Sequence, residues 1–355
     1  MKQATNHIIP VSVITGFLGS GKTTLLNHLV KQPGMSDTAV IVNEFGEIGI
    51  DHLLIEQAIE DTVLLQNGCI CCSIRGDLVD TLESLLDQVE RGDIPSFSRA
   101  IIETTGLADP APVLQTLMTN ERLAGRFSLD AIVTTVDAVN GARQLVEFGE
   151  SQKQAAVADH IFMTKTDLAD DAAAFDLETK LRAINRRAPI IKIINGQADP
   201  DSLFGNSPLS TKSRNDALDK WLLDIDDPEP SDHGPGHDHE HRHSHGHGNG
   251  GIDSFTVRHD APLPWDAVKS WLESVASLRG SDLLRVKGIL NVEGRDGPVI
   301  IHGVQHIFHP PVELEKWPSD DHQTRIVFIT RNIDLAALGN SLAAFVEDSI
   351  TSSII

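Results

Sequence analysis

Apolar runs alternate with amphipathic stretches through the first part of the chain. The runs are apolar on successive residues rather than on every second one, at 8–15, 38–43, 63–66, 98–102, 130–136, 160–163 and 189–194. Strands of this kind are buried on both faces, as in parallel sheets. Residues 77–89 and 176–187 carry apolar side chains at helical spacing, and Asp109-Pro110 resembles a helix start. The pattern predicts an α/β fold, a mainly parallel sheet with helices on both sides, over about residues 1–225.

The pattern changes twice after residue 225. Residues 226–251 contain proline, glycine, acids and a histidine tract, with almost nothing apolar, which predicts a flexible linker. Beyond it, strands are predicted at 252–258, 283–290, 299–301 and 325–330, and helices at 265–278 and 334–346. We therefore predict an α/β domain at 1–225, a His-rich linker at 226–251 and a smaller α+β domain at 252–355.

Charge and composition narrow the classes of function. The 355 residues carry a formal net charge of −22, which disfavours binding to nucleic acid and favours a cation as partner. No segment reaches the roughly 18 apolar residues of a membrane helix. The first seven residues are polar and do not resemble a signal peptide. We expect a cytoplasmic protein that binds neither nucleic acid nor membrane.

The segment GFLGSGKT, residues 16–23, fits the phosphate-binding pattern G-x-x-x-x-G-K-[ST] between a predicted strand and a predicted helix. Its glycines let backbone N–H groups surround a phosphate chain, Lys22 reaches the outer phosphates, and Thr23 offers a hydroxyl to Mg²⁺. The alternative is a glycine-rich turn without nucleotide. The residues predicted to bind nucleotide here are Gly16, Gly19, Ser20, Gly21, Lys22, Thr23 and Thr24.

Glu103 and Gly106 extend this predicted site. A nucleotide-hydrolysing P-loop protein needs an acid near Mg²⁺ at the end of a neighbouring strand, and a glycine whose N–H can meet the terminal phosphate. Glu103 ends the apolar run at 98–102 and Gly106 follows three residues later, although Asp is the usual acid at such a position. With Lys22 they form the predicted catalytic set, the alternative for Glu103 being an exposed acid at a strand end.

Residues 164–167, Thr-Lys-Thr-Asp, follow a predicted strand and are similar to the guanine-reading motif N-K-x-D. Asp167 would accept hydrogen bonds from the N1 and N2 groups of guanine, which adenine does not reproduce, and the stem of Lys165 would lie along the base. Thr164 replaces the usual Asn and retains only a hydroxyl, so guanine selectivity is expected to be looser. The alternative is a surface K-x-D sequence after a strand.

The three cysteines, Cys69, Cys71 and Cys72, lie within four positions, which excludes a disulfide framework and indicates a reducing compartment. The C-x-C-C spacing predicts three thiolate ligands on one tight turn, suited to Zn²⁺ with one further donor. That donor could be Glu44, Glu47, His52, water or a partner, and an incomplete set suits a site that loads and unloads metal. Cysteines used in packing and a redox pair are the alternatives.

Histidines offer further metal contacts. The linker has alternating histidines at 233, 237, 239, 241, 243, 245 and 247, which favour weak binding of several divalent ions, as in a local reservoir. A solvated linker is the alternative. For His302, His306 and His309, a role as core or surface residues stands beside a role as ligands.

The combination of GFLGSGKTT, VNEFGEIGID, GCICC, IETTGLADP, TKTD, a His-rich linker and the RVKG segment at 285–288 resembles the CobW family of P-loop GTPases over essentially the whole chain. The resemblance implies a GTPase whose nucleotide state controls transfer of zinc or cobalt. It also implies that the cysteines are metal ligands and that residues 44–51 form a switch segment. On this basis we expect GTP, Mg²⁺ and Zn²⁺ or Co²⁺ as ligands, and a client metalloprotein docked on the C-terminal domain.

Two other functions fit part of the sequence. A metal-storage protein would use the histidines and cysteines, with a nucleotide that is only structural. A P-loop kinase would need an arginine-rich lid, and no segment resembles one. No glutamine or arginine is assigned by the sequence to orient the attacking water, so we expect slow intrinsic hydrolysis.

Overall fold

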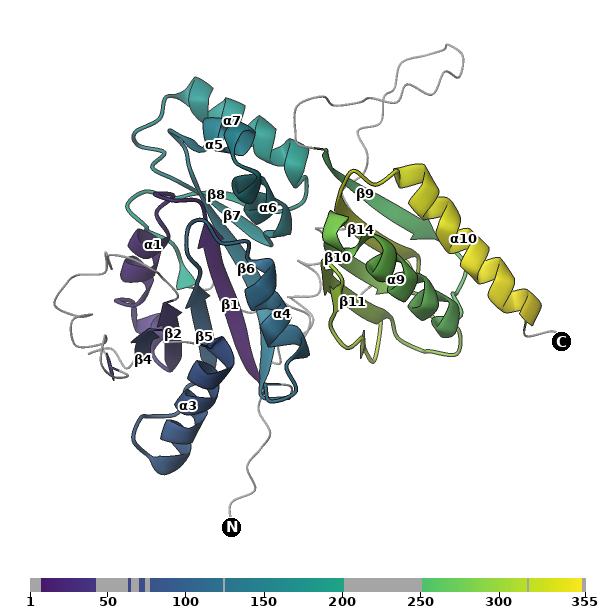
Figure 1. Cartoon of the computed structure of the whole chain (residues 1–355), viewed down its shortest axis with the longest axis horizontal. Coiled ribbons are helices and arrows are strands. Elements are labelled where there is room, and N and C mark those ends of the chain that lie inside the picture. The colour runs from purple at the N-terminus through teal and green to yellow at the C-terminus, as the bar shows by residue number, and fades with distance from the viewer. Residues whose placement is uncertain are drawn as a thin grey trace.

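Two β-sheets, each with its own helices, organise the chain in the computed structural model (Figure 1). The structure describes residues 8–42, 63–64, 70–73, 77–123, 125–200, 251–317 and 319–352. The predicted metal ligands Glu44, Glu47 and Cys69 and the linker at 226–250 lie outside the described residues. No helix in the described ranges is long and apolar enough to cross a membrane.

The first sheet is mainly parallel, as predicted. Of the strands that the structure describes here, seven run parallel, and β3 at one side of the sheet pairs antiparallel with β4. Within the described residues the spatial order is β3 (Val63–Leu64), β4 (Ile70–Ser73), β2 (Thr38–Val42), β5 (Arg99–Glu103), β1 (Ile9–Gly16), β6 (Phe127–Asp137), β7 (His160–Thr164), β8 (Ile190–Lys192). Because the central strands are parallel, their carboxyl ends lie along the same edge of the sheet. The residues that end these strands are Gly16, Glu103, Asp137 and Thr164.

Helices cover both faces of this sheet, which confirms the predicted arrangement. On one face α1 (Lys22–Leu29) buries Leu25, Leu26 and Leu29 against strand residues such as Ile14. The other face is covered by the other helices that the structure describes in this domain, which share a second core with the opposite strand residues. They are α3 (Leu78–Arg91), α4 (Ala111–Thr119), α5 (Gly141–Glu147), α6 (Gly149–Val157) and α7 (Asp171–Ile184).

The second sheet is antiparallel and belongs to an α+β domain, again as predicted. Its order is β12 (Ile307–Phe308), β11 (Val299–Val304), β10 (Leu283–Leu290), β14 (Thr324–Arg331), β9 (Ile252–His259), and β13 (Val312–Glu313) pairs with β11. Helices α9 (Trp265–Arg279) and α10 (Leu335–Ser352) pack on one face of it. The fully buried Trp271 stands edge-on to Phe328 in this core.

The opposite face of the second sheet meets the first domain. Strand β10 contacts α6, and β11 and β12 contact α4 (Figure 1). Leu284, Val304 and Ile329 belong to the same apolar cluster as the helices of the first domain. Two helices that follow the nucleotide-binding edge of the first sheet therefore also support the second sheet.

Candidate nucleotide and metal site

Three glycines give the loop between β1 and α1 its shape. Gly16, Gly19 and Gly21 have φ values of 141°, 70° and 92°, a backbone region that favours glycine. A Cβ atom at Gly16 would lie 2.3 Å from the carbonyl oxygen of Thr135, so this position also needs glycine for space. Gly21 caps α1 without any side-chain hydrogen bond, which leaves the first N–H groups of the helix available to an anion.

Lys22 is folded over this loop. Its Nζ donates to the carbonyl oxygens of Gly16, at 3.0 Å, and Phe17, at 3.3 Å, and the residue is buried. The ammonium group therefore stands above the backbone that would surround a phosphate chain. A buried cation here provides the electrostatic attraction that a nucleoside triphosphate needs.

Thr23 and Glu103 meet across the site. The Thr23 hydroxyl donates to Glu103 Oε1 at 2.9 Å, and Glu103 ends β5 directly beside β1, with Ile14 as its register partner. Glu103 is buried, at 1% exposure, so it is not an exposed acid at a strand end. A hydroxyl and a carboxylate oxygen held together are ligands that fit Mg²⁺.

Gly106 lies against the phosphate-binding loop. A Cβ atom built on it would lie 2.8 Å from both the N and Cα atoms of Leu18. The residue must therefore remain a glycine for the loop after β5 to approach the loop after β1. From the sequence we predicted that the Gly106 N–H meets the terminal phosphate. The structure places Gly106 beside the loop that would hold that phosphate.

The Thr-Lys-Thr-Asp segment is connected directly to the phosphate-binding loop. Thr164 Oγ1 donates to the Ser20 carbonyl at 2.7 Å, and Lys165 Nζ donates to the Gly19 carbonyl at 2.7 Å. Asp167 is exposed at the same edge of the sheet. The Thr164 hydroxyl therefore connects the end of β7 to the phosphate-binding loop, and the Asp167 side chain remains accessible to a nucleotide base.

Asp137 anchors Lys165 and was missed by the sequence analysis. The two side chains form an ion pair at 2.7 Å, and Asp137 also accepts from the backbone N–H groups of Val139 and Asn140. Burial raises the pKa of Asp137, but the hydrogen bonds from Lys165, Asn140 and Val139 outweigh it and lower the pKa overall. The available signal was an aspartate that ends an apolar strand just before Asn140.

Cys71 and Cys72 lie in strand β4 rather than on the tight turn that the spacing predicted. Strand pairing explains the difference, because β4 hydrogen-bonds to β2 on one side and to β3 on the other. Cys72 is the register partner of Ile41, one position before the pair between Val42 and Glu103. Since adjacent strands lie about 4.8 Å apart, the backbone of Cys72 is about 10 Å from strand β5.

The C-terminal histidines divide into a buried pair and an exposed residue. The rings of His302 and His309 lie 5.2 Å apart, and both residues are buried, whereas His306 is exposed. Burial and the nearby Arg285 guanidinium lower the pKa of His309 to about 4 and keep that of His302 well below its usual value. Among the described residues, no group of three or more His, Cys, Asp or Glu side chains could hold a metal ion.

The fold and this loop define a P-loop nucleotide-binding protein. Residues 10–192 match the CobW/HypB/UreG nucleotide-binding domain, and residues 252–346 match the cobalamin synthesis protein cobW C-terminal domain. The chain therefore belongs to the CobW family, and the resemblance read from its motifs is confirmed.

Named relatives cover almost all of the chain. The zinc chaperone YjiA of Escherichia coli is 34% identical over 90% of this chain and 93% of its own length. The zinc chaperone CobW of Pseudomonas aeruginosa is 31% identical over 94% of this chain and 90% of its own. A crystal structure of the Zn(II)-bound YjiA GTPase is similar with a TM-score of 0.70 at 32% identity, covering 95% of this chain and 99% of that one.

Proposed function

We propose that this protein is a GTP-hydrolysing zinc chaperone, in which the nucleotide state controls transfer of the metal to a client metalloprotein. The observation that carries the proposal is the contact between Thr23 and Glu103 in a P-loop site that also has an exposed Asp167. Relatives named as zinc chaperones over nine-tenths of the chain support the choice of metal. Co²⁺ is the second candidate metal.

Each residue of the site has a distinct task in hydrolysis. The loop from Gly16 to Thr24 binds the phosphates through backbone N–H groups, and Lys22 offsets charge on the outer phosphates. Mg²⁺, bound by Thr23 with Glu103 nearby, would neutralise charge that develops on the phosphate oxygens. The N–H of Gly106 donates to the terminal phosphate, so the loop after β5 differs between the two nucleotide states.

We propose a metal site in the same domain, close to the loop after β5. We assign Zn²⁺ to Cys69, Cys71 and Cys72, with Glu44 or Glu47 as a further ligand, where it is the cargo of the protein. The β4 backbone is about 10 Å from β5, and Gly106 follows β5, so we expect the nucleotide state to influence the thiolates. The C-terminal domain would bind the client that receives the metal.

The direct test measures GTP hydrolysis and metal affinity on one preparation. We expect slow hydrolysis that changes when Zn²⁺ is added, and Zn²⁺ affinity that differs at least about tenfold between the GTP-analogue and GDP forms, which corresponds to about 1.4 kcal/mol of coupling. Equal affinity in the two forms would contradict nucleotide-controlled transfer. Deleting Ser231–Gly250 separates storage from transfer, because only a storage protein would lose its high-affinity binding.

A Cys71→Ser variant tests the thiolate site. Because a hydroxyl at this position is not ionised at neutral pH, we expect Zn²⁺ affinity to fall by roughly 100-fold or more, since losing even an outer-shell partner costs about 10–100-fold. Competition with a chelator in the GTP-analogue form measures the change. Ser73→Ala, also in β4, is the control and should retain wild-type affinity. Unchanged affinity in Cys71→Ser would remove the cysteines from the proposal.

An Asp167→Asn variant tests base recognition. Asn replaces one acceptor by a donor, so we expect GTP affinity to fall at least about tenfold, since a hydrogen bond to a charged group contributes about 1.5–3 kcal/mol. Xanthosine triphosphate, which has a carbonyl where guanine has its N2 amine, should bind better than in wild type. Titration with fluorescent nucleotides measures both, with the exposed Asp171→Asn as control. A parallel loss for both nucleotides would indicate damage to the loop instead.

A further inference from the structure

Helix α6 holds the loop that contains Gly106. Gln154, on this helix and 1% exposed, donates from Nε2 to the carbonyl oxygens of Gly106, at 3.3 Å, and Ala108, at 3.0 Å. Lys153, the preceding residue, forms an ion pair with Asp109 at 2.8 Å. Two adjacent side chains of α6 therefore bind the two ends of the segment from Gly106 to Asp109.

The Gln154 amide forms its hydrogen bonds to described residues through Nε2 and not through Oε1. Its Oε1 atom is buried and accepts no hydrogen bond from any residue that the structure describes. Leaving a buried acceptor unsatisfied costs about 1–3 kcal/mol, which a hydrophobic side chain of similar size would avoid. The group that holds the loop therefore has one buried acceptor that is not used in this arrangement.

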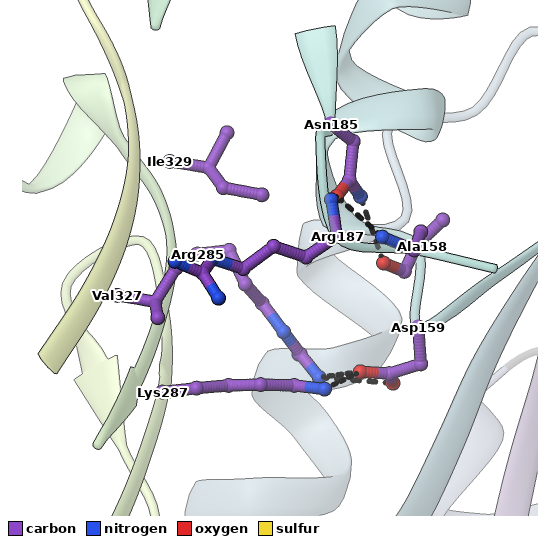
Figure 2. A pocket seen from close by; sticks show the side chains of 9 residues that line it. Ala158, Asp159, Asn185, Arg187, Arg285, Lys287, Val327 and Ile329 are labelled. Atoms are coloured by element: carbon purple, nitrogen blue, oxygen red, sulfur yellow. Dashed lines mark hydrogen bonds and ion pairs between the residues drawn. The ribbon is translucent and has the colours of Figure 1, made fainter. Parts of the chain in front are cut away.

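The end of α6 holds the second domain. Asp159, two residues after the helix, accepts from Arg285 Nη2 at 2.7 and 2.9 Å and pairs with Lys287 Nζ at 2.6 Å. Figure 2 shows both cationic side chains extending from β10 toward this carboxylate. The three residues line a small cavity between the domains. Every member of this ion cluster is largely withdrawn from solvent, which strengthens the attraction between its charges.

The segment between these two contacts is short and firmly fixed. Asp159 follows Gln154 by five residues, and α6 ends between them at Val157. The Asn185 side chain binds the carbonyls of Ala155, at 3.1 Å, and Ala158, at 2.9 Å, and Thr134 donates to the Gln154 carbonyl at 2.7 Å. These bonds hold the last turn of α6 in one conformation, so residues 154–158 form a stiff connection between the Gly106 loop and Asp159.

We propose that Gln154 is a positioning residue that directs Gly106 toward the terminal phosphate, and that α6 transmits the position of this loop to β10 through Asp159. The inference rests on the proposed function, in which Gly106 binds that phosphate. Helix α4 begins at Ala111, directly after the loop, and contacts β11 and β12, which adds a second connection to the same sheet. The second domain would in this way respond to the nucleotide without touching it.

A pair of glutamine variants on α6 tests the inference in the full-length chain. Gln154→Met keeps the volume and removes the hydrogen bonds, whereas Gln152→Met is the control, because Gln152 donates to the Leu145 carbonyl at 2.6 Å and not to the loop. For Gln154→Met we expect affinity for a non-hydrolysable GTP analogue to fall about tenfold with GDP affinity unchanged, since only the terminal phosphate contact is lost. Gln152→Met should match wild type with both nucleotides.

Amide hydrogen exchange of β10, residues 283–290, supplies the second measurement. In wild type we expect exchange to differ between the GTP-analogue and GDP forms, and in Gln154→Met we expect that difference to disappear. If wild type hydrolyses GTP but Gln154→Met keeps both the affinity and the exchange difference, the role of α6 is wrong and the proposed function stands. If wild type neither hydrolyses GTP nor distinguishes the two nucleotides, the proposed function fails first.

Discussion

Replacing Lys22 with alanine is expected to lower GTP hydrolysis by at least about 100-fold, the usual cost of removing a donor aimed at developing charge. Lys22 is buried over the loop, with its Nζ 3.0 Å from the Gly16 carbonyl. Lys165, whose Nζ also reaches the loop at the Gly19 carbonyl, is paired with Asp137 and does not take its place. Phosphate release measured under saturating GTP gives the rate, and nucleotide titration gives the affinity.

Lys31→Ala is the matched control for this variant. Lys31 is exposed just after the other end of α1, about 13 Å away along the helix axis. We expect its hydrolysis rate to match that of wild type. Equal rates in wild type and Lys22→Ala would show that the measured hydrolysis does not come from this site, and the enzymatic part of the proposal would then fail.

Asp159→Asn is expected to destabilise the protein by about 3–5 kcal/mol, because removing one partner of a buried ion cluster leaves uncompensated charge. Asp159 is 7% exposed and faces both Arg285 and Lys287, and its Oδ2 also accepts from the Ile132 N–H at 2.8 Å. Asp176→Asn is the control, because Asp176 pairs with Lys180 on an exposed helix face and should cost about 0.5 kcal/mol or less. Urea unfolding, with the slope compared between variants, measures the difference.

The same carboxylate predicts how stability depends on pH. Burial raises the pKa of Asp159, but the charges of Arg285 and Lys287 outweigh it and hold the pKa far below the usual range. The stabilisation is therefore fully present above the unfolded-state pKa of about 3.9 and is lost progressively as the pH falls below that value. The Asp159→Asn variant should already be less stable than wild type at neutral pH. Its stability should also lack the contribution that wild type loses as the pH falls. An unchanged acid profile would assign the loss to packing alone.

Strands and their ends were the most predictable part of the fold. The strand predicted at 8–15 is β1 (Ile9–Gly16), and the helix predicted to follow the phosphate-binding pattern is α1 (Lys22–Leu29). Continuous apolar sequence leaves few alternatives to a buried parallel strand, and parallel pairing then brings the strand ends to one edge. This is why Thr23 and Glu103, 80 residues apart, could be brought together from sequence and do meet in the structure.

Helices with polar sequence were harder to predict. Helix α6 (Gly149–Val157) has no apolar periodicity, yet Ala155 and Ala156 are fully buried by their tertiary contacts. The start of α7 was placed five residues too late, because Asp170 caps it by accepting from the Ala173 N–H at 2.7 Å before any apolar stripe begins. Asp109 does accept from the Ala111 N–H at 3.0 Å, and α4 begins at that alanine.

Residues that position other residues were the hardest to predict from the sequence. Asp137 and Gln154 carry no motif, and their roles arise from partners 28 and 48 positions away. Tertiary contacts of this range leave no periodic signal in the sequence. The buried position of Arg285 was likewise invisible, since an arginine on a strand is usually exposed and only Asp159 on another domain explains its burial.

The aromatic residues give the second domain an optical signal of its own. The chain has no tyrosine, and three of its four tryptophans lie in the second domain, with Trp271 buried against Phe328. Fluorescence excited at the red edge of tryptophan absorption therefore contains no emission from the first 220 residues. In a Trp221→Phe variant the tryptophan emission would come from the second domain alone, so a change in emission on adding a nucleotide that binds at Gly16–Thr23 would report a response of that domain.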